Sequence, residues 1–225
     1  MLKPKRKITR DELKKDSFVE SVFELRSYLK DNLTILSRIG GGLALIIALA
    51  VFFSQSSRNS FHEAEFLLTQ SSLYLDNGDI QNAKILLQEL IDEYSSTEPG
   101  SLGGYHLAQI HLKSDNSESA LPLLLNYSKK GKNPFLLSSV NHAISSIYHQ
   151  NYDIKNAIKY QLASIKHSKT KKDGAFSSIR LAELYIKDGS FKNSSDILDE
   201  IKNNFSDDLD VMNKVEYVSG LLMDK

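Results

Sequence analysis

Small and apolar residues recur every 37 positions between residues 61 and 225. Several columns keep their character at this spacing. A column here is the set of residues that occupy the same position in successive repeats. In the first part of the repeat there is a small column (Ser71, Ala108, Ser145, Ala182, Ser219), an apolar column (Leu73, Ile110, Ile147, Leu184, Leu221) and a mainly aromatic column (Tyr74, His111, Tyr148, Tyr185, Leu222). The second part has another small column (Ala83, Ala120, Ala157, Ser194) and a large apolar column (Leu86, Leu123, Tyr160, Ile197). A constant period of this length is typical of a helical repeat protein.

Turn-forming residues divide each repeat into two helices. They follow the aromatic column, at Asn77-Gly78-Asp79, Asn116, Tyr152-Asp153 and Asp188-Gly189-Ser190. Glycine tolerates a left-handed backbone, and Asp, Asn or Ser can cap the helix that follows. We therefore expect an all-α solenoid of about four and a half helix pairs over residues 58–225, with the small columns where the two helices of a pair cross.

A different pattern precedes the repeats. Residues 39–53 are continuously uncharged, and the apolar character begins near residue 33. Because a membrane-crossing helix needs about 20 residues, we predict a single transmembrane helix over residues 34–57. A signal peptide cleaved near Ser54-Gln55-Ser56 is the alternative, but 38 residues precede the apolar run, which is too long for an ordinary leader.

The distribution of charge predicts the orientation of this helix. Residues 1–38 contain ten Lys or Arg, whereas the twenty residues after Phe53 contain only Arg58. Positively charged flanks stay in the cytoplasm. We expect a single-pass protein of the bacterial inner membrane, with a cytoplasmic N-terminus and a periplasmic C-terminal domain.

Residues 1–33 are expected to form a basic cytoplasmic arm. Thr9-Arg10-Asp11-Glu12 matches a helix capping box, and Phe18, Val22, Leu25 and Leu29 then fall on one helical face. This helix either lies on the inner leaflet or a partner, or simply continues into the membrane helix. Within the membrane, small residues four positions apart favour a homodimer: Gly40, Ala44 and Ala48.

Composition argues against several other functions. The chain has 28 basic and 28 acidic residues and no cysteine, so it gives no electrostatic signal for nucleic-acid binding and cannot use thiolate chemistry. The six histidines do not show the i, i+4 spacing of helical zinc ligands. We therefore predict no catalytic residue, no metal site and no cofactor, and a protein that is not an enzyme.

The repeats resemble the tetratricopeptide repeat family in residues 71–87, 108–124, 145–161 and 182–198. The usual period of that family is about 34 residues, so we place the extra residues in the connections between pairs. Gln161 and Ser164 depart from the pattern, because they replace apolar residues in the third unit. The layout of basic arm, membrane helix and repeats resembles the ancillary Sec-translocon subunit family of bacterial inner membranes. That resemblance implies a periplasmic repeat domain that escorts secreted proteins between the translocon and chaperones.

The resemblance also implies that the first helix of each pair lines a concave protein-binding groove. The candidate groove residues are Tyr105, Gln109, Leu112, His142, Ser146, His149, Glu183 and Ile186. Two functions are then open. One is a membrane-anchored scaffold or chaperone-like adaptor for secreted or envelope polypeptides, with translocon or chaperone components as further partners. The other is a structural organiser of a division or secretion assembly with one fixed partner.

Overall fold

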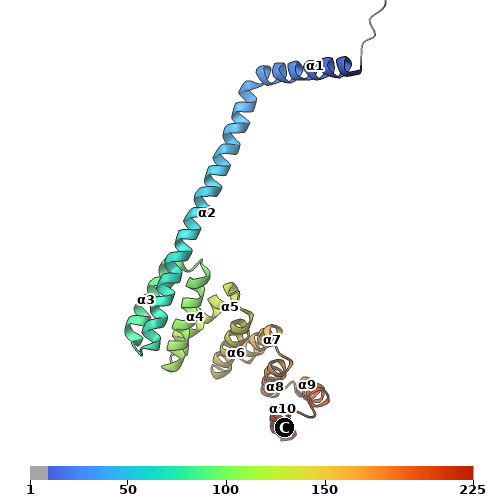
Figure 1. Cartoon of the computed structure of the whole chain (residues 1–225). Coiled ribbons are helices and arrows are strands. Elements are labelled where there is room, and N and C mark those ends of the chain that lie inside the picture. Colours follow the sequence, from blue (N-terminus) through green and yellow to red (C-terminus); the bar gives the residue numbers. More distant parts are fainter. Residues whose placement is uncertain (1–9, 225) are drawn as a thin grey trace, which may run out of the picture. The chain divides into compact units, whose positions relative to one another are not determined.

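The computed structural model describes the backbone of residues 10–224 and the side chains of residue 18 and residues 20–224. Within these residues it contains ten α-helices and no strand. Their bounds are α1 Arg10–Asp31, α2 Leu33–Asp76, α3 Ile80–Tyr94, α4 Glu98–Lys113, α5 Ser117–Lys130, α6 Pro134–Gln150, α7 Ile154–His167, α8 Lys171–Asp188, α9 Phe191–Asn204 and α10 Leu209–Met223 (Figure 1). The predicted all-α class is confirmed. The chain divides into two compact units, Met1–Arg58 and Asn59–Lys225.

The first unit contains α1 and the N-terminal part of α2. Every residue from Leu33 to Asn59 is exposed, including the apolar side chains of the run. This part of α2 is long and apolar enough to cross a membrane. Phe18, Val22, Leu25 and Leu29 on α1 are exposed too, whereas Thr9 and the side chains of the rest of the expected capping box, at residues 10–12, lie outside the described part of the chain.

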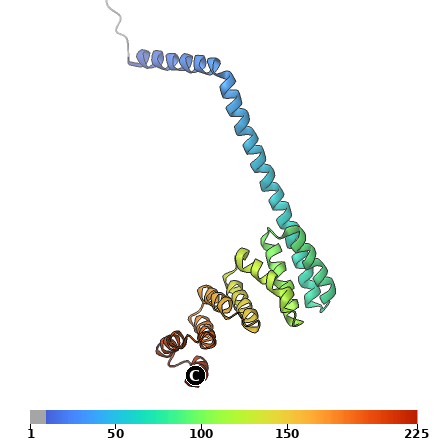
Figure 2. The ribbon, with the colours of Figure 1, turned by 180° about the vertical axis from the view of Figure 1, so that it is seen from behind.

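The second unit is a stack of helix pairs. The last part of α2 pairs with α3, and the pairs α4/α5, α6/α7 and α8/α9 follow, with α10 as the final half (Figures 1 and 2). The second helices begin at Ile80, Ser117, Ile154 and Phe191, which are 37 residues apart. The 37-residue period of the sequence is therefore the period of the backbone.

Each turn within a pair contains one residue with a left-handed backbone at the same repeat position. These residues are Gly78, Asp115, Tyr152 and Gly189, with φ of 76°, 53°, 61° and 81°. Acidic or amide side chains then cap the first three second helices, with Asp79, Asn116 and Asp153 accepting a backbone N–H at 3.0–3.2 Å. In the fourth pair, Ser190 makes no side-chain capping bond.

The small columns lie where the helices of a pair meet. Ala83, Ala120, Ala157 and Ser194 are fully buried. In the third pair the contact is direct, because the Ser145 hydroxyl on α6 donates a hydrogen bond of 2.8 Å to the Ala157 carbonyl on α7. The predicted helix crossing is confirmed there.

The exposed fraction of the residues in the apolar column differs between the first helix pair and the inner pairs of the stack. Ile110, Ile147 and Leu184 are buried at 3–7 % exposure, whereas Leu73 is 57 % exposed. Ile110 packs in a cluster with Leu87 and Leu90 of the preceding pair. Leu73 is exposed because no helix pair precedes it within this unit.

Candidate concave groove

The third pair, α6/α7, differs from the others in its core. At one position on the second helices the residues are Leu87, Leu124, Gln161 and Leu198, and all four are at most 1 % exposed. Three positions later they are Leu90, Tyr127, Ser164 and Ile201, again all buried. The third pair therefore has two polar side chains where every other pair has a large apolar one.

Gln161 connects three helices. Its Nε2 donates to the Ser177 carbonyl oxygen on α8 at 2.8 Å, and its Oε1 lies 3.1 Å from His142 Nδ1 on α6. A carbonyl oxygen can only accept a hydrogen bond, so the Gln161 amide must direct its NH₂ group to Ser177 and its oxygen to His142. Nδ1 of His142 must then carry a proton, which leaves Nε2 of the neutral ring as the acceptor.

Ser164 makes a second polar contact within the same pair. Its hydroxyl donates to the Ser138 carbonyl at 2.9 Å, and the Ser138 hydroxyl donates to the Ser164 carbonyl at 3.0 Å. A fully buried hydroxyl would cost free energy without such partners. The polar substitutions are therefore satisfied by hydrogen bonds, and they connect α6, α7 and α8 without a continuous apolar cluster.

Two cavities open along the first helices beside this polar network. The first has a volume of about 610 Å³ and lies against α6, α8 and the α7–α8 connection, with Phe135, Ser138, His142, Phe176 and Ile179 among its lining residues. The second has about 640 Å³ and lies between α6, α8 and α10, where Ser146, His149, Ile186, Tyr217 and Leu221 line it. We call the two cavities together the α6–α8–α10 groove.

Three charged residues line both cavities: Arg180, Glu183 and Lys214. The cavities are therefore adjacent, and these charges lie between them. Arg180 Nη1 and Glu183 Oε2 form an ion pair at 2.8 Å. Lys214 forms no ion pair with any described residue, so its positive charge is available to a ligand.

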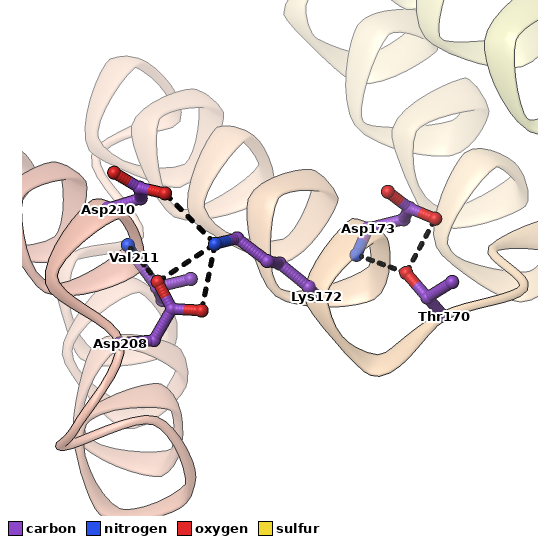
Figure 3. Close-up of polar contacts among 6 residues, drawn as sticks. All are labelled: Thr170, Lys172, Asp173, Asp208, Asp210 and Val211. Carbon is purple, nitrogen blue, oxygen red and sulfur yellow. Dashed lines mark hydrogen bonds and ion pairs between the residues drawn. The ribbon is translucent and has the colours of Figure 1, made fainter.

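Lys172 holds the N-terminal ends of α8 and α10 together and so fixes one wall of this groove (Figure 3). Its Nζ lies 2.9 Å from Asp208 Oδ2 and 3.0 Å from Asp210 Oδ2. Asp208 in turn caps α10 by accepting the Val211 N–H at 3.3 Å. The hydrogen bonds to Asp208 and Asp210 raise the pKa of Lys172, and the bond from Lys172 lowers the pKa of Asp208.

Five of the eight residues expected from the sequence lie in the groove. His142 and Glu183 line the first cavity, and Ser146, His149, Glu183 and Ile186 line the second. The other three, Tyr105, Gln109 and Leu112, lie on α4 and line neither cavity.

Tyr105 is instead half-buried against neighbouring side chains of its own helix pair. Its ring lies 5.5 Å from that of Tyr127, measured between centroids, and both Tyr105 and Leu112 pack against the apolar cluster of α4, α5 and α6. This burial raises the pKa of Tyr105. The structure therefore concentrates the candidate site on the third and fourth pairs and α10.

Sequence reasoning missed four groove residues: Phe135, Phe176, Lys214 and Tyr217. Lys214 and Tyr217 lie on α10, the unpaired last helix, which was counted only as half a repeat and not as a wall. Phe135 lies in the first turn of α6 and is 65 % exposed, and Tyr217 is 60 % exposed. A large exposed aromatic residue on a groove-forming helix is the signal that could have identified Phe135, Phe176 and Tyr217, and no comparable signal marks Lys214. Among the described residues, no group of three or more His, Asp or Glu side chains could hold a metal ion.

Comparison with solved structures identifies the architecture. The chain is similar to the nearly identical TPR-like repeats of a kinesin-light-chain-like protein from Podosopora anserina, with a TM-score of 0.55 over 72 % of this chain and 88 % of that one. The fold is a tetratricopeptide-like solenoid. A single-substitution variant of the same protein gives the same TM-score and coverage. Sequence identity is 13 % in both cases, so the similarity establishes the tetratricopeptide-like fold alone.

No protein-family profile matches the sequence, and no curated protein matches it either.

Proposed function

We propose that this protein is a membrane-anchored, protein-binding scaffold that acts as a chaperone-like adaptor. It binds secreted or envelope polypeptides at the periplasmic face of the bacterial inner membrane, alongside the Sec translocon. The repeats bind the polypeptide, and the apolar part of α2 tethers them to the membrane. Small residues at positions 40, 44 and 48 of that helix allow two copies to associate in the bilayer.

The α6–α8–α10 groove is the observation that carries the binding function. Its two adjacent cavities combine exposed aromatic side chains with the charge of Lys214, which is unpaired among the described residues. Aromatic residues provide large contact areas at low conformational entropy cost, which suits binding of an extended segment. The polar core of the third pair supports the same conclusion, because buried residues that break the pattern of a fold are expected at functional sites.

The membrane location and orientation rest on separate features. The apolar part of α2 is exposed throughout, which would be unfavourable in water and favourable in lipid. The excess of Lys and Arg before this segment favours a cytoplasmic N-terminus. The layout shared with the ancillary Sec-translocon subunit family supports translocating polypeptides as the ligands.

Site-specific photocrosslinking in native membranes tests this function. A photoreactive amino acid at His149, in the second cavity, is expected to crosslink to several exported polypeptides. The control is the same amino acid at Lys192, an exposed residue on α9 that lines neither cavity. Equal crosslinking from both positions would argue against the groove. A single stoichiometric product from His149 would instead establish the alternative, an organiser with one fixed partner.

A further inference from the structure

The arrangement of charge within the groove indicates which polypeptide segments it prefers. We propose that the groove selects an extended segment in which an acidic side chain is flanked on both sides by apolar ones, and that Lys214 binds its carboxylate. This inference rests on the proposed function and names the ligand class of the same site.

The position of the charges argues for an acidic residue inside the segment. Arg180, Glu183 and Lys214 line both cavities, so a ligand atom that reaches them has a cavity on either side. A chain terminus would fill one cavity and leave the other empty. A continuous chain fills both, with its charged residue in the middle.

The balance of charge argues for a negative ligand group. The two cavities are lined by four Lys or Arg side chains (Lys169, Arg180, Lys187, Lys214) and three carboxylates (Asp173, Glu183, Asp224). Glu183 and Arg180 neutralise each other in an ion pair of 2.8 Å, which leaves three Lys side chains against Asp173 and Asp224. Of these three Lys residues, Lys214 alone lines both cavities, and it forms no ion pair within the described part of the chain. It is therefore the cation that a carboxylate between the cavities would reach.

The apolar surfaces on both sides supply the flanking contacts. In the first cavity, Phe135 and Phe176 are exposed to solvent. In the second, Tyr217 and Leu221 are exposed as well. Large apolar side chains of the ligand can cover these residues and remove their surface from water.

His142 adds a directional contact in the first cavity. Because Gln161 holds the proton on Nδ1, the Nε2 of the neutral ring can accept a hydrogen bond from a backbone N–H of the ligand. Backbone recognition of this kind does not depend on ligand sequence. The acidic residue and its apolar neighbours therefore determine selectivity.

A peptide-binding measurement with the full chain in phosphatidylcholine nanodiscs tests the proposal. The probes are fluorescent nine-residue peptides, blocked at both ends, with Leu and Phe on either side of a central Glu, Gln or Lys. The Glu peptide is expected to bind about tenfold more tightly than the Gln peptide. Lys214→Gln is expected to abolish this difference, and the control Lys192→Gln to leave it unchanged. The difference should also shrink as salt is added, because exposed charges are screened.

Each other result has a defined meaning. Equal binding of the Glu and Gln peptides, or tighter binding of the Lys peptide, would overturn the charge selectivity while leaving a groove that binds apolar segments. A preference for Glu that survives in Lys214→Gln would also overturn the assignment. If no peptide binds while His149 still crosslinks to exported polypeptides, the ligand class is wrong and the scaffold function stands. Failure of both experiments would contradict the two proposals together.

Discussion

Two junctions in the same stack differ in how far hydrogen bonds replace apolar contacts. Between α4/α5 and α6, the contact is mainly an apolar cluster that includes Leu124, Val140 and Ile144, all fully buried, with one hydrogen bond of 2.8 Å from the Ser128 hydroxyl to Asn141. Between α6/α7 and α8, the corresponding Leu position is Gln161, and hydrogen bonds replace part of the apolar contact. Because the backbone period is the same at both, the difference is not required by the fold.

The comparison indicates what each junction contributes. Burial of a Leu side chain stabilises a junction by roughly 1.5–3 kcal/mol, whereas a satisfied hydrogen bond contributes only about 0.5–1.5 kcal/mol. Because Gln161 makes two hydrogen bonds, it stabilises its junction about as much as a buried Leu would. It also fixes the tautomer and orientation of His142 at the first cavity. We infer that the apolar junction maintains the stack and the polar junction maintains the groove.

The largest effect is expected from breaking the apolar junction. Leu124→Ala removes a fully buried side chain from the apolar cluster of α4, α5 and α6. It should lower the free energy of unfolding by about 2–5 kcal/mol. Chemical denaturation of the full chain in detergent, followed by circular dichroism, measures the change. Leu162→Ala, at a position that is 47 % exposed, is the matched control and should change it little. Similar stabilities for the two variants would show that Leu124 is not a core residue.

A smaller loss of stability is expected when the ion pairs between Lys172 on α8 and the acidic residues at the start of α10 are removed. The pKa of Asp208 is lowered, so its contribution to stability is present above its unfolded value of 3.8 and is lost as pH falls through the folded value. The pKa of Lys172 is raised, so its contribution is present below 10.5 and is lost as pH rises through the folded value. The ion pairs therefore stabilise the fold throughout the neutral range.

Lys172→Met removes these ion pairs. Because Lys172 and Asp208 are partly exposed and Asp210 is exposed, we expect a small decrease in melting temperature at neutral pH that disappears in acid once Asp208 is protonated. Lys171→Met is the matched control. Lys171 lies next to Lys172 in the sequence, but its side chain is exposed and forms no ion pair within the described part of the chain. A difference in melting temperature between the two variants that does not change with pH would mean that Lys172 acts by packing on Phe176. The Nζ atom of Lys172 lies 5.9 Å from the centroid of the Phe176 ring.

The sequence predicted the fold well because the repeat is made of local features. Helix crossings within one unit depend on small residues such as Ala120 and Ala157, and the turns depend on residues such as Gly78. The same residue types recur every 37 positions, so each unit folds in the same way. The left-handed backbone at Asp115 and Tyr152 was less evident, because neither residue type favours it as glycine does.

The site was predicted less completely because it depends on contacts between individual side chains. Within the second pair, Tyr105 on α4 packs against Tyr127 near the end of α5, and this contact leaves no trace in the periodic columns. Gln161 was recognised as a departure from the pattern, but its role depends on the nearby Ser177 carbonyl of the next pair. The proposed membrane location and orientation were predicted from hydropathy and charge, without any contact between side chains.

The most direct test of the account is Gln161→Leu, which restores the residue found at this position in the other three pairs. Two quantities are measured on the same full-length preparation: the melting temperature and the affinity for the Glu-containing peptide. We predict a nearly unchanged melting temperature, because gained apolar burial offsets the lost hydrogen bonds, together with weaker peptide binding because His142 is no longer held. Unchanged affinity in a folded Gln161→Leu protein would contradict the claim that the polar junction maintains the groove.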